Sequence, residues 1–247
     1  MMKAKKDRFT FYKPNKKQPV WKVVKPVLKN LFYNKFEVIN LAGEIDKKSV
    51  LVGNHEGKKG PLVYELYLPL FSVKWGAYGM LGNYRDRYNY LRNVLYIQKY
   101  KKGKFISTIK ASFEAIFSKL FYRGIKVLPS FPDARVLKTF TYSVEVLDGN
   151  NAVMVYPEDS NDGYFEKPKK FFNGFVGLCE YYYKKRGEDL PVYPTYLHLK
   201  KKMLVIGKPF RVNELKNQGM TRSQIAEFFK DQVNALFDDY VKDKNKK

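Results

Sequence analysis

Two titratable side chains follow short apolar runs that lie far apart in the sequence. His55 ends the run 49–54, and Glu158 follows the run 152–155 and the turn Tyr156-Pro157. Apolar runs broken by glycine, asparagine or proline are typical of buried strands that end in a turn. Alone, each motif favours an ordinary loop histidine or turn glutamate. Together they predict acid–base chemistry at the carboxyl ends of two strands, where α/β sheets bind their ligands.

The two motifs, in their order and with their flanks, resemble the glycerolipid acyltransferase superfamily, which includes the lysophosphatidic acid acyltransferases. That family carries Asn-His, four residues and Asp at a strand end, much later Phe-Pro-Glu-Gly, and later still a proline-containing strand. The matching segments here are Asn54-His55, Tyr156-Pro157-Glu158, 190–194 and 204–209. Since they occur in the family's order, the resemblance covers residues from roughly 50 to 210.

The resemblance implies an α/β fold, a single domain with a mixed or mostly parallel sheet flanked by helices. It also implies a role in phospholipid biosynthesis, the transfer of a fatty acyl group from a thioester to the hydroxyl of a lysolipid or another lipid acceptor. Coenzyme A or acyl carrier protein would carry the acyl group as co-substrate, with no further cofactor. His55 would act as general base, and Glu158 would organise the acceptor pocket. The other residues expected to line that pocket are Asn54, Lys58, Lys59, Tyr156, Pro157, Asp159 and Ser160.

The chain departs from the family at the residues that assist the histidine and hold a phosphate. Gly60 stands where the family has its aspartate, and Glu56 and Glu65 are the candidates to orient the imidazole instead. Pro129-Ser130 and Ser160-Asn161 stand where the family has phosphate-binding arginines, whose bidentate contacts an asparagine does not reproduce. We therefore expect an acceptor other than an ordinary glycerol phosphate, or a phosphate held by other basic residues. The basic candidates are Lys58, Lys59, Lys126 and Arg135.

A formal net charge of +23 indicates an anionic partner, which could be a lipid surface, a nucleic acid or an acidic carrier protein. Only nine of the 47 basic residues are arginine. A lysine-rich surface suits an anionic membrane, whereas proteins that read bases rely on arginine, so nucleic acid is the less favoured partner. Coding bias explains part of the lysine excess. The alternative function is a basic binding protein for anionic membrane or nucleic acid whose catalysis has decayed, since decay would remove the aspartate and both arginines.

The single cysteine, Cys179, cannot form an internal disulfide, which fits a reducing compartment. It lies in an apolar helical pattern and is expected in the core. There is no run of 18 apolar residues and no apolar segment behind the N-terminus. We therefore expect a cytoplasmic protein, peripheral at the inner face of the cell membrane. His198 follows a strand without any metal-ligand spacing, so it is expected to be structural or exposed, and no metal is expected.

The chain is expected to form one domain. Residues 1–19 are predicted to be a basic mobile arm, 20–240 the acyltransferase-like domain and 241–247 a lysine-rich tail. Residues 21–33 show apolar and lysine residues at helical spacing around Pro26, which favours an interfacial membrane helix and a packed surface helix equally. The aromatic stretch 71–100 is best interpreted as a packed helical excursion. A cover for an acyl chain, a membrane contact and a single-stranded nucleic acid site are the alternatives.

The remaining elements follow from hydrophobic periodicity. Segments 36–41 and 49–54 are predicted to be a hairpin or adjacent strands, and Pro61 is a possible start for a helix that includes 62–68. Apolar residues three and four apart predict an amphipathic helix over 105–121. The other predicted strands are 125–128, 152–156, 191–197 and 203–207, and the other predicted helices are 132–147, 167–186 and 225–240.

Overall fold

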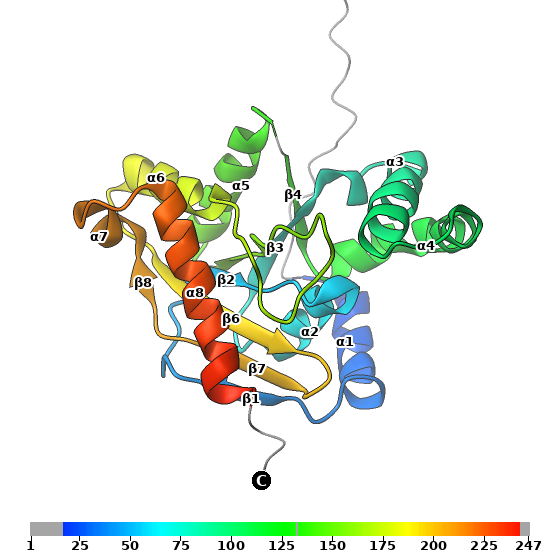
Figure 1. Ribbon diagram of the computed structural model, residues 1–247, viewed down its shortest axis with the longest axis horizontal. Coiled ribbons are helices and arrows are strands. Elements are labelled where there is room, and N and C mark those ends of the chain that lie inside the picture. Colours follow the sequence, from blue (N-terminus) through cyan, green and yellow to red (C-terminus); the bar gives the residue numbers. More distant parts are fainter. Residues whose placement is uncertain (1–16, 132, 243–247) are drawn as a thin grey trace, which may run out of the picture.

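The computed structural model describes residues 17–131 and 133–242, and a single sheet lies at its centre (Figure 1). The strands are β1 (Glu37–Asn40), β2 (Val50–Gly53), β3 (Ser72–Ala77), β4 (Val127–Ser130), β5 (Ala152–Val155), β6 (Pro191–His198), β7 (Met203–Ile206) and β8 (Phe210–Arg211). Their order is β1-β7-β6-β2-β5-β3-β4, with β8 paired to β6. Only the β6–β7 and β6–β8 pairs are antiparallel, so the expected mostly parallel α/β sheet is confirmed.

Helices flank this sheet on both faces and at one end. The α-helices are α1 (Pro19–Leu31), α2 (Gly60–Tyr67), α3 (Tyr84–Asn89), α4 (Lys104–Gly124), α5 (Val136–Asp148), α6 (Gly174–Arg186), α7 (Val212–Asn217) and α8 (Arg222–Tyr240). A π-helix, η3 (Tyr90–Lys99), and two short 3-10 helices, η1 (Gly57–Lys59) and η2 (Tyr78–Met80), complete the elements.

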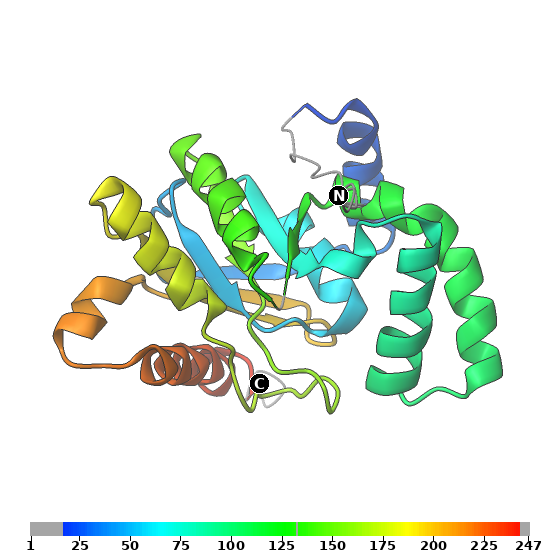
Figure 2. The same cartoon turned by 90° about the horizontal axis from the view of Figure 1, so that it is seen from above.

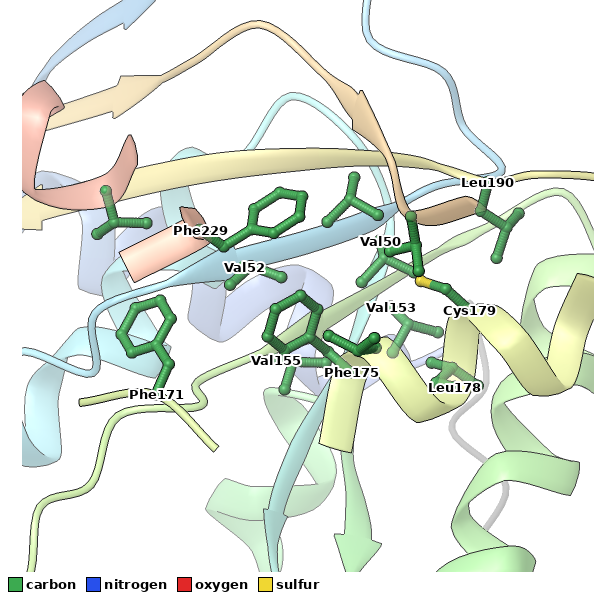
Figure 3. Close-up of a cluster of buried hydrophobic side chains, with 14 of the residues drawn as sticks. Val50, Val52, Val153, Val155, Phe171, Phe175, Leu178, Cys179, Leu190 and Phe229 are labelled. Carbon is green, nitrogen blue, oxygen red and sulfur yellow. The ribbon is translucent and has the colours of Figure 1, made fainter. Parts of the chain in front are cut away.

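Alternation along β2 divides the core between the two faces of the sheet. Val50 and Val52 point to the face covered by α5, α6 and α8, while Leu51 points to the opposite face, covered by α2. Figure 3 shows Phe175 and Cys179 of α6 packed against the first of these faces. Cys179 is 1% exposed, and burial raises its pKa, so the expected core position is confirmed.

The helices α3, η3 and α4 form a unit beside the sheet, at the end opposite to α6 and α7 (Figure 2). The inner face of α4 carries small side chains, namely Ser107, Ala111, Ala115 and Ser118. These residues allow α4 to lie close to Leu91 and Leu95 of η3. The buried Arg87 of α3 adds hydrogen bonds from its guanidinium to the Ala115 carbonyl, 2.9 and 3.1 Å long.

Several predicted elements differ from the observed ones. β1 is not adjacent to β2, because the β6–β7 hairpin lies between them. The stretch 71–100 begins with the strand β3, which the helical interpretation missed. Residues 167–173 precede α6 rather than belonging to it, because Phe171 pairs with Glu158 in an isolated bridge. The strand predicted at 125–128 is observed at 127–130, and the helix predicted from 132 begins at Val136.

The ends of the domain also differ from the expected boundaries. The parts of the predicted arm and tail at 1–16 and 243–247, like residue 132, lie outside the described residues. In the described part of the chain, α1 begins at Pro19, the last residue of the predicted arm. Val241, the first residue of the predicted tail, is fully buried against the core. No helix in the described ranges is both long and apolar enough to span a bilayer.

A buried ion cluster joins α2 to the sheet beneath α1. Glu65 of α2 accepts hydrogen bonds from the ammonium groups of Lys74 in β3 and Lys126 before β4. Burial alone would raise the pKa of Glu65, but the two lysines outweigh it and lower the pKa to about 2. Trp21 and Lys25 of α1 contact the same carboxylate at 3.4 and 3.5 Å. The carboxylate therefore compensates two buried positive charges.

We predict that Glu65→Ala lowers the free energy of unfolding by about 3–5 kcal/mol, because it leaves Lys74 and Lys126 buried without their counter-charge. Urea denaturation measures this loss. The matched control is Glu188→Ala, which removes an exposed 2.8 Å ion pair with Lys48 and should cost at most about 1 kcal/mol. Equal losses for the two variants would contradict the compensating role of Glu65.

Candidate active site

The register of the sheet brings the two predicted motifs together. β2 and β5 are parallel, with Val52 opposite Val155, so the residues after both strands emerge at the same edge. There the main-chain N–H of His55 donates a 3.1 Å hydrogen bond to the Glu158 carboxylate. A 2.7 Å hydrogen bond from Phe172 N–H to the Pro157 carbonyl stabilises the turn that carries Glu158. The two motifs therefore meet at this edge through the main-chain N–H of His55 and not through its imidazole.

The imidazole of His55 is oriented by the main chain of its own loop. Its Nδ1 lies 2.6 Å from the Gly57 carbonyl oxygen. Because a carbonyl can only accept, Nδ1 carries the proton, and in the neutral ring Nε2 keeps a free lone pair. The turn needed for this contact places Glu56 and Gly57 at positive φ, 46° and 66°. The tautomer with its proton on Nδ1 is the one that a general base acting through Nε2 requires.

The position of the missing aspartate leaves no space for a side chain. A Cβ on Gly60 would lie 1.9 Å from the His55 carbonyl oxygen, so any larger residue would displace the loop. The two proposed replacements are engaged elsewhere. The Glu56 carboxylate accepts a 2.9 Å hydrogen bond from Leu199 N–H, and Glu65 belongs to the buried ion cluster. Neither orients Nδ1, contrary to expectation, because the Gly57 carbonyl occupies that position.

Aromatic rings enclose the half-buried His55 side chain. Tyr164 stacks on the imidazole at a centroid distance of 5.2 Å, and Tyr156 meets it at an angle of 68° at 5.1 Å. Burial lowers the pKa of His55, and the positive charge of Lys99 lowers it further, to about 4. The ring is therefore neutral at pH 7 and able to accept a proton.

Lys99, at the end of η3, is the basic residue of the site that the sequence analysis missed. Its ammonium group donates a 2.5 Å hydrogen bond to the hydroxyl of the buried Ser160, and it lies 5.4 Å from the Tyr164 ring centroid. Burial lowers the pKa of Lys99, while Glu158 and Asp159 oppose that shift. One lysine in a long aromatic stretch carries no sequence signal that would link it to either loop.

The Glu158 side chain is buried, with 6% of the residue exposed, and its two carboxylate oxygens differ in their hydrogen bonds. Its Oε2 accepts the hydrogen bond from His55, whereas Oε1 is buried without a partner among the described residues. Burial raises the pKa of this carboxyl, although hydrogen bonds from main-chain N–H groups of His55 and Phe165 counteract the rise. Buried acceptor oxygens without a partner are uncommon in proteins, which marks Glu158 as a candidate functional carboxyl.

Two of the expected pocket residues hold the framework of the site. Both ends of the Asn54 amide are used, because Nδ2 donates to the Leu197 carbonyl and Oδ1 accepts from Leu197 N–H, each at 2.8 Å. Lys58 binds Glu114 of α4 and, at 3.3 Å, the Tyr96 hydroxyl, so it links the His55 loop to the helical unit. Asn54 and Lys58 therefore position the loop and have little capacity left for a ligand.

The other predicted basic residues are distributed over the surface and the core. Lys59 is exposed beside α2, and Lys126 is held by Glu65. Arg135 forms a 2.6 Å ion pair with Asp133 at the surface. Among the described residues, Lys99 is the cation whose positive charge lowers the pKa of His55, so the basic candidates from the sequence are not the cation of the site.

His198 is buried and structural, one of the two expected outcomes. Its Nδ1 accepts a 3.1 Å hydrogen bond from Lys201 N–H, and its Nε2 lies 3.0 Å from the Glu166 carboxylate. With both nitrogens engaged and its ring stacked on Phe237, it has no group available for catalysis.

Comparison with known proteins yields no assignment. No protein-family model matches the sequence, and no curated protein matches it significantly. The resemblance to acyltransferases therefore rests on the sequence motifs alone.

We predict that Lys99→Gln raises the pKa of His55 towards its ordinary value, because the nearby positive charge disfavours the imidazolium. Histidine ring resonances followed by NMR during a pH titration measure the shift. Lys170→Gln is the matched control, since Lys170 is exposed and lies 3.9 Å from Asp159 of the same loop. An unchanged or lower pKa in Lys99→Gln would contradict the electrostatic role of Lys99.

Proposed function

We propose that the protein transfers a fatty acyl group from a thioester of coenzyme A or acyl carrier protein to the hydroxyl of a lipid acceptor. His55 Nε2 takes the hydroxyl proton as the oxygen attacks the thioester carbonyl. The tetrahedral intermediate then expels the thiolate, which receives the proton from the imidazolium. The products are an ester and a free thiol, and no acyl-enzyme is formed. The hydrogen bond from Nδ1 to the Gly57 carbonyl, which leaves Nε2 as the base, is the observation that carries this proposal.

The low pKa of His55 has two consequences for this mechanism. At pH 7 the ring is almost entirely neutral, so the base is available without prior deprotonation. It is also weaker than an ordinary histidine, because optimal general bases have pKa values near the working pH. The site must then depend strongly on positioning, to which the contacts of Tyr156 and Tyr164 with the ring contribute.

The charges around His55 favour an acceptor without a phosphate monoester. Lys99 is the cation whose charge acts on His55, and the carboxylates of Glu158 and Asp159 already act on Lys99. A dianion would meet these carboxylates without the paired arginines that hold phosphate in the resembled family. An uncharged hydroxyl lipid avoids that repulsion. We therefore propose a glycolipid or another lysolipid with a neutral hydroxyl region as the acceptor.

We predict that His55→Ala lowers acyl transfer by at least about a hundredfold, the usual contribution of a general base. The measurement is release of free thiol from an acyl thioester in the presence of a lysolipid extract. Circular dichroism and the thermal midpoint control for folding, which a half-buried loop side chain should affect little. Activity retained in the variant would exclude His55 as the base. A wild-type protein that releases no thiol yet binds anionic vesicles or nucleic acid would instead support the decayed binding protein.

We predict that lysophosphatidic acid is a poorer acceptor than a neutral glycolipid or lysophosphatidylcholine. Each lost hydrogen bond to a charged group costs roughly 1.5–3 kcal/mol, which is at least about a tenfold loss. The test compares kcat/KM across these acceptors with one acyl donor. If lysophosphatidic acid proves the best acceptor, the charge argument is wrong, and Lys99→Gln should then reduce its kcat/KM selectively.

A further inference from the structure

The amphipathic helix α4 turns its large apolar side chains towards solvent. Its buried face consists mainly of small side chains, whereas Phe105, Phe113 and Phe117 are 79%, 65% and 69% exposed. The same outer face carries further large apolar residues, namely Ile106, Ile109, Ile116 and Leu120. A surface helix normally buries its apolar stripe. The structure therefore leaves the apolar stripe of its longest described helix uncovered.

The neighbouring helix α1 extends this apolar surface. Val23, Leu31 and Phe32 are each about 70% exposed at α1 or its end. The helices meet where the Gln18 side chain donates a 2.9 Å hydrogen bond to the Arg123 carbonyl. Between them lies an open groove of about 730 Å³. Its apolar lining includes Trp21, Val24, Leu28, Phe117, Leu120 and Phe121.

Basic side chains border this surface, while acidic ones are almost absent from its two helices. Lys22 on α1 and Lys110 and Lys119 on α4 are exposed. α1 contains no acidic residue, and Glu114, the single acidic residue of α4, binds Lys58 and Tyr96. The net charge of the whole chain has the same positive sign. The surface thus combines an apolar centre with a cationic border.

We propose that α1 and α4 dock the protein on an anionic lipid bilayer, with their exposed apolar side chains in its hydrocarbon region and their lysines at the headgroups. Amphipathic helices that lie in a membrane interface have this composition. Large contiguous apolar patches on a protein mark interaction sites rather than ordinary surface. The cationic border favours anionic lipid over an apolar protein surface, since each lysine near such a membrane contributes to binding.

The groove reaches the segment that directly follows the His55 loop. Lys59 and Leu62, which also line it, follow His55 by only a few residues. A lipid whose acyl chain enters the groove from the bilayer would therefore lie beside the His55 loop. This link to substrate delivery rests on the proposed function, whereas membrane docking itself does not require catalysis.

The test is cosedimentation of the full chain with vesicles, comparing equal parts phosphatidylglycerol and phosphatidylcholine with phosphatidylcholine alone. The wild type should bind the anionic vesicles more strongly, and added salt should weaken binding. The double variant Phe113→Asp, Phe117→Asp should bind at least about tenfold less, because two aromatic side chains no longer enter the hydrocarbon. A second variant with serine at both positions removes the apolar groups without adding charge and should also lose binding.

The matched control is Tyr183→Asp on α6, an exposed aromatic residue at the opposite end of the molecule, which should bind like the wild type (Figure 2). Equal binding by the serine variant and the wild type would overturn the proposal. So would a stable wild-type dimer, seen by sedimentation velocity, that these substitutions dissociate without any vesicle binding. His55→Ala should bind vesicles normally, so a failure of docking and a failure of catalysis are distinguished by the same set of proteins.

Discussion

The parallel pairing of β2 with both β5 and β6 is the constraint on which the candidate site depends. β2 is buried throughout and hydrogen-bonded on both edges, so two neighbours fix its register. That register brings His55 beside Glu158, while the Asn54 amide binds both main-chain groups of Leu197 on the other side. A slip of one residue would turn every side chain of β2 to the opposite face and separate these groups.

A carboxylate beside His55 Nδ1 would have two effects: it would fix the tautomer and it would stabilise the imidazolium. The contact with the Gly57 carbonyl provides the first effect. A carbonyl fixes the tautomer equally well, because it accepts the Nδ1 hydrogen. It carries no full negative charge, however, and so stabilises an imidazolium less than an aspartate would. The positive charge of Lys99 disfavours the imidazolium further and lowers the pKa of His55. The site therefore combines a well-oriented imidazole with a low affinity for protons. The loop leaves no space for a side chain at position 60, where the resembled family has its aspartate.

The sequence predicts the parts of the fold and site where residue type alone indicates burial or a turn. The runs that become β2 and β5 are apolar and end in turn residues, so their ends, with His55 and Glu158, could be placed at one edge. β3 could not be recognised, because Lys74 interrupts its apolar pattern. This buried lysine is stabilised by the Glu65 carboxylate and the Ser72 carbonyl, which are tertiary and local contacts that the pattern does not show. Lys99 and the Gly57 carbonyl escaped prediction for a related reason, since their roles arise from tertiary contacts and not from residue type.

The helix α4 shows a further limit of periodicity, because a regular apolar stripe predicts a helix but not the medium that the stripe faces. Here the small residues face α3 and η3, and the aromatic ones face outwards. The hydrogen bonds of Lys58 with Glu114 and Tyr96 also join this helical unit to the His55 loop. Under the proposed docking, contact with a bilayer would thus act on a helical unit that is hydrogen-bonded to the loop of the base. The orientation of the protein on the membrane and the position of the imidazole would then be fixed together.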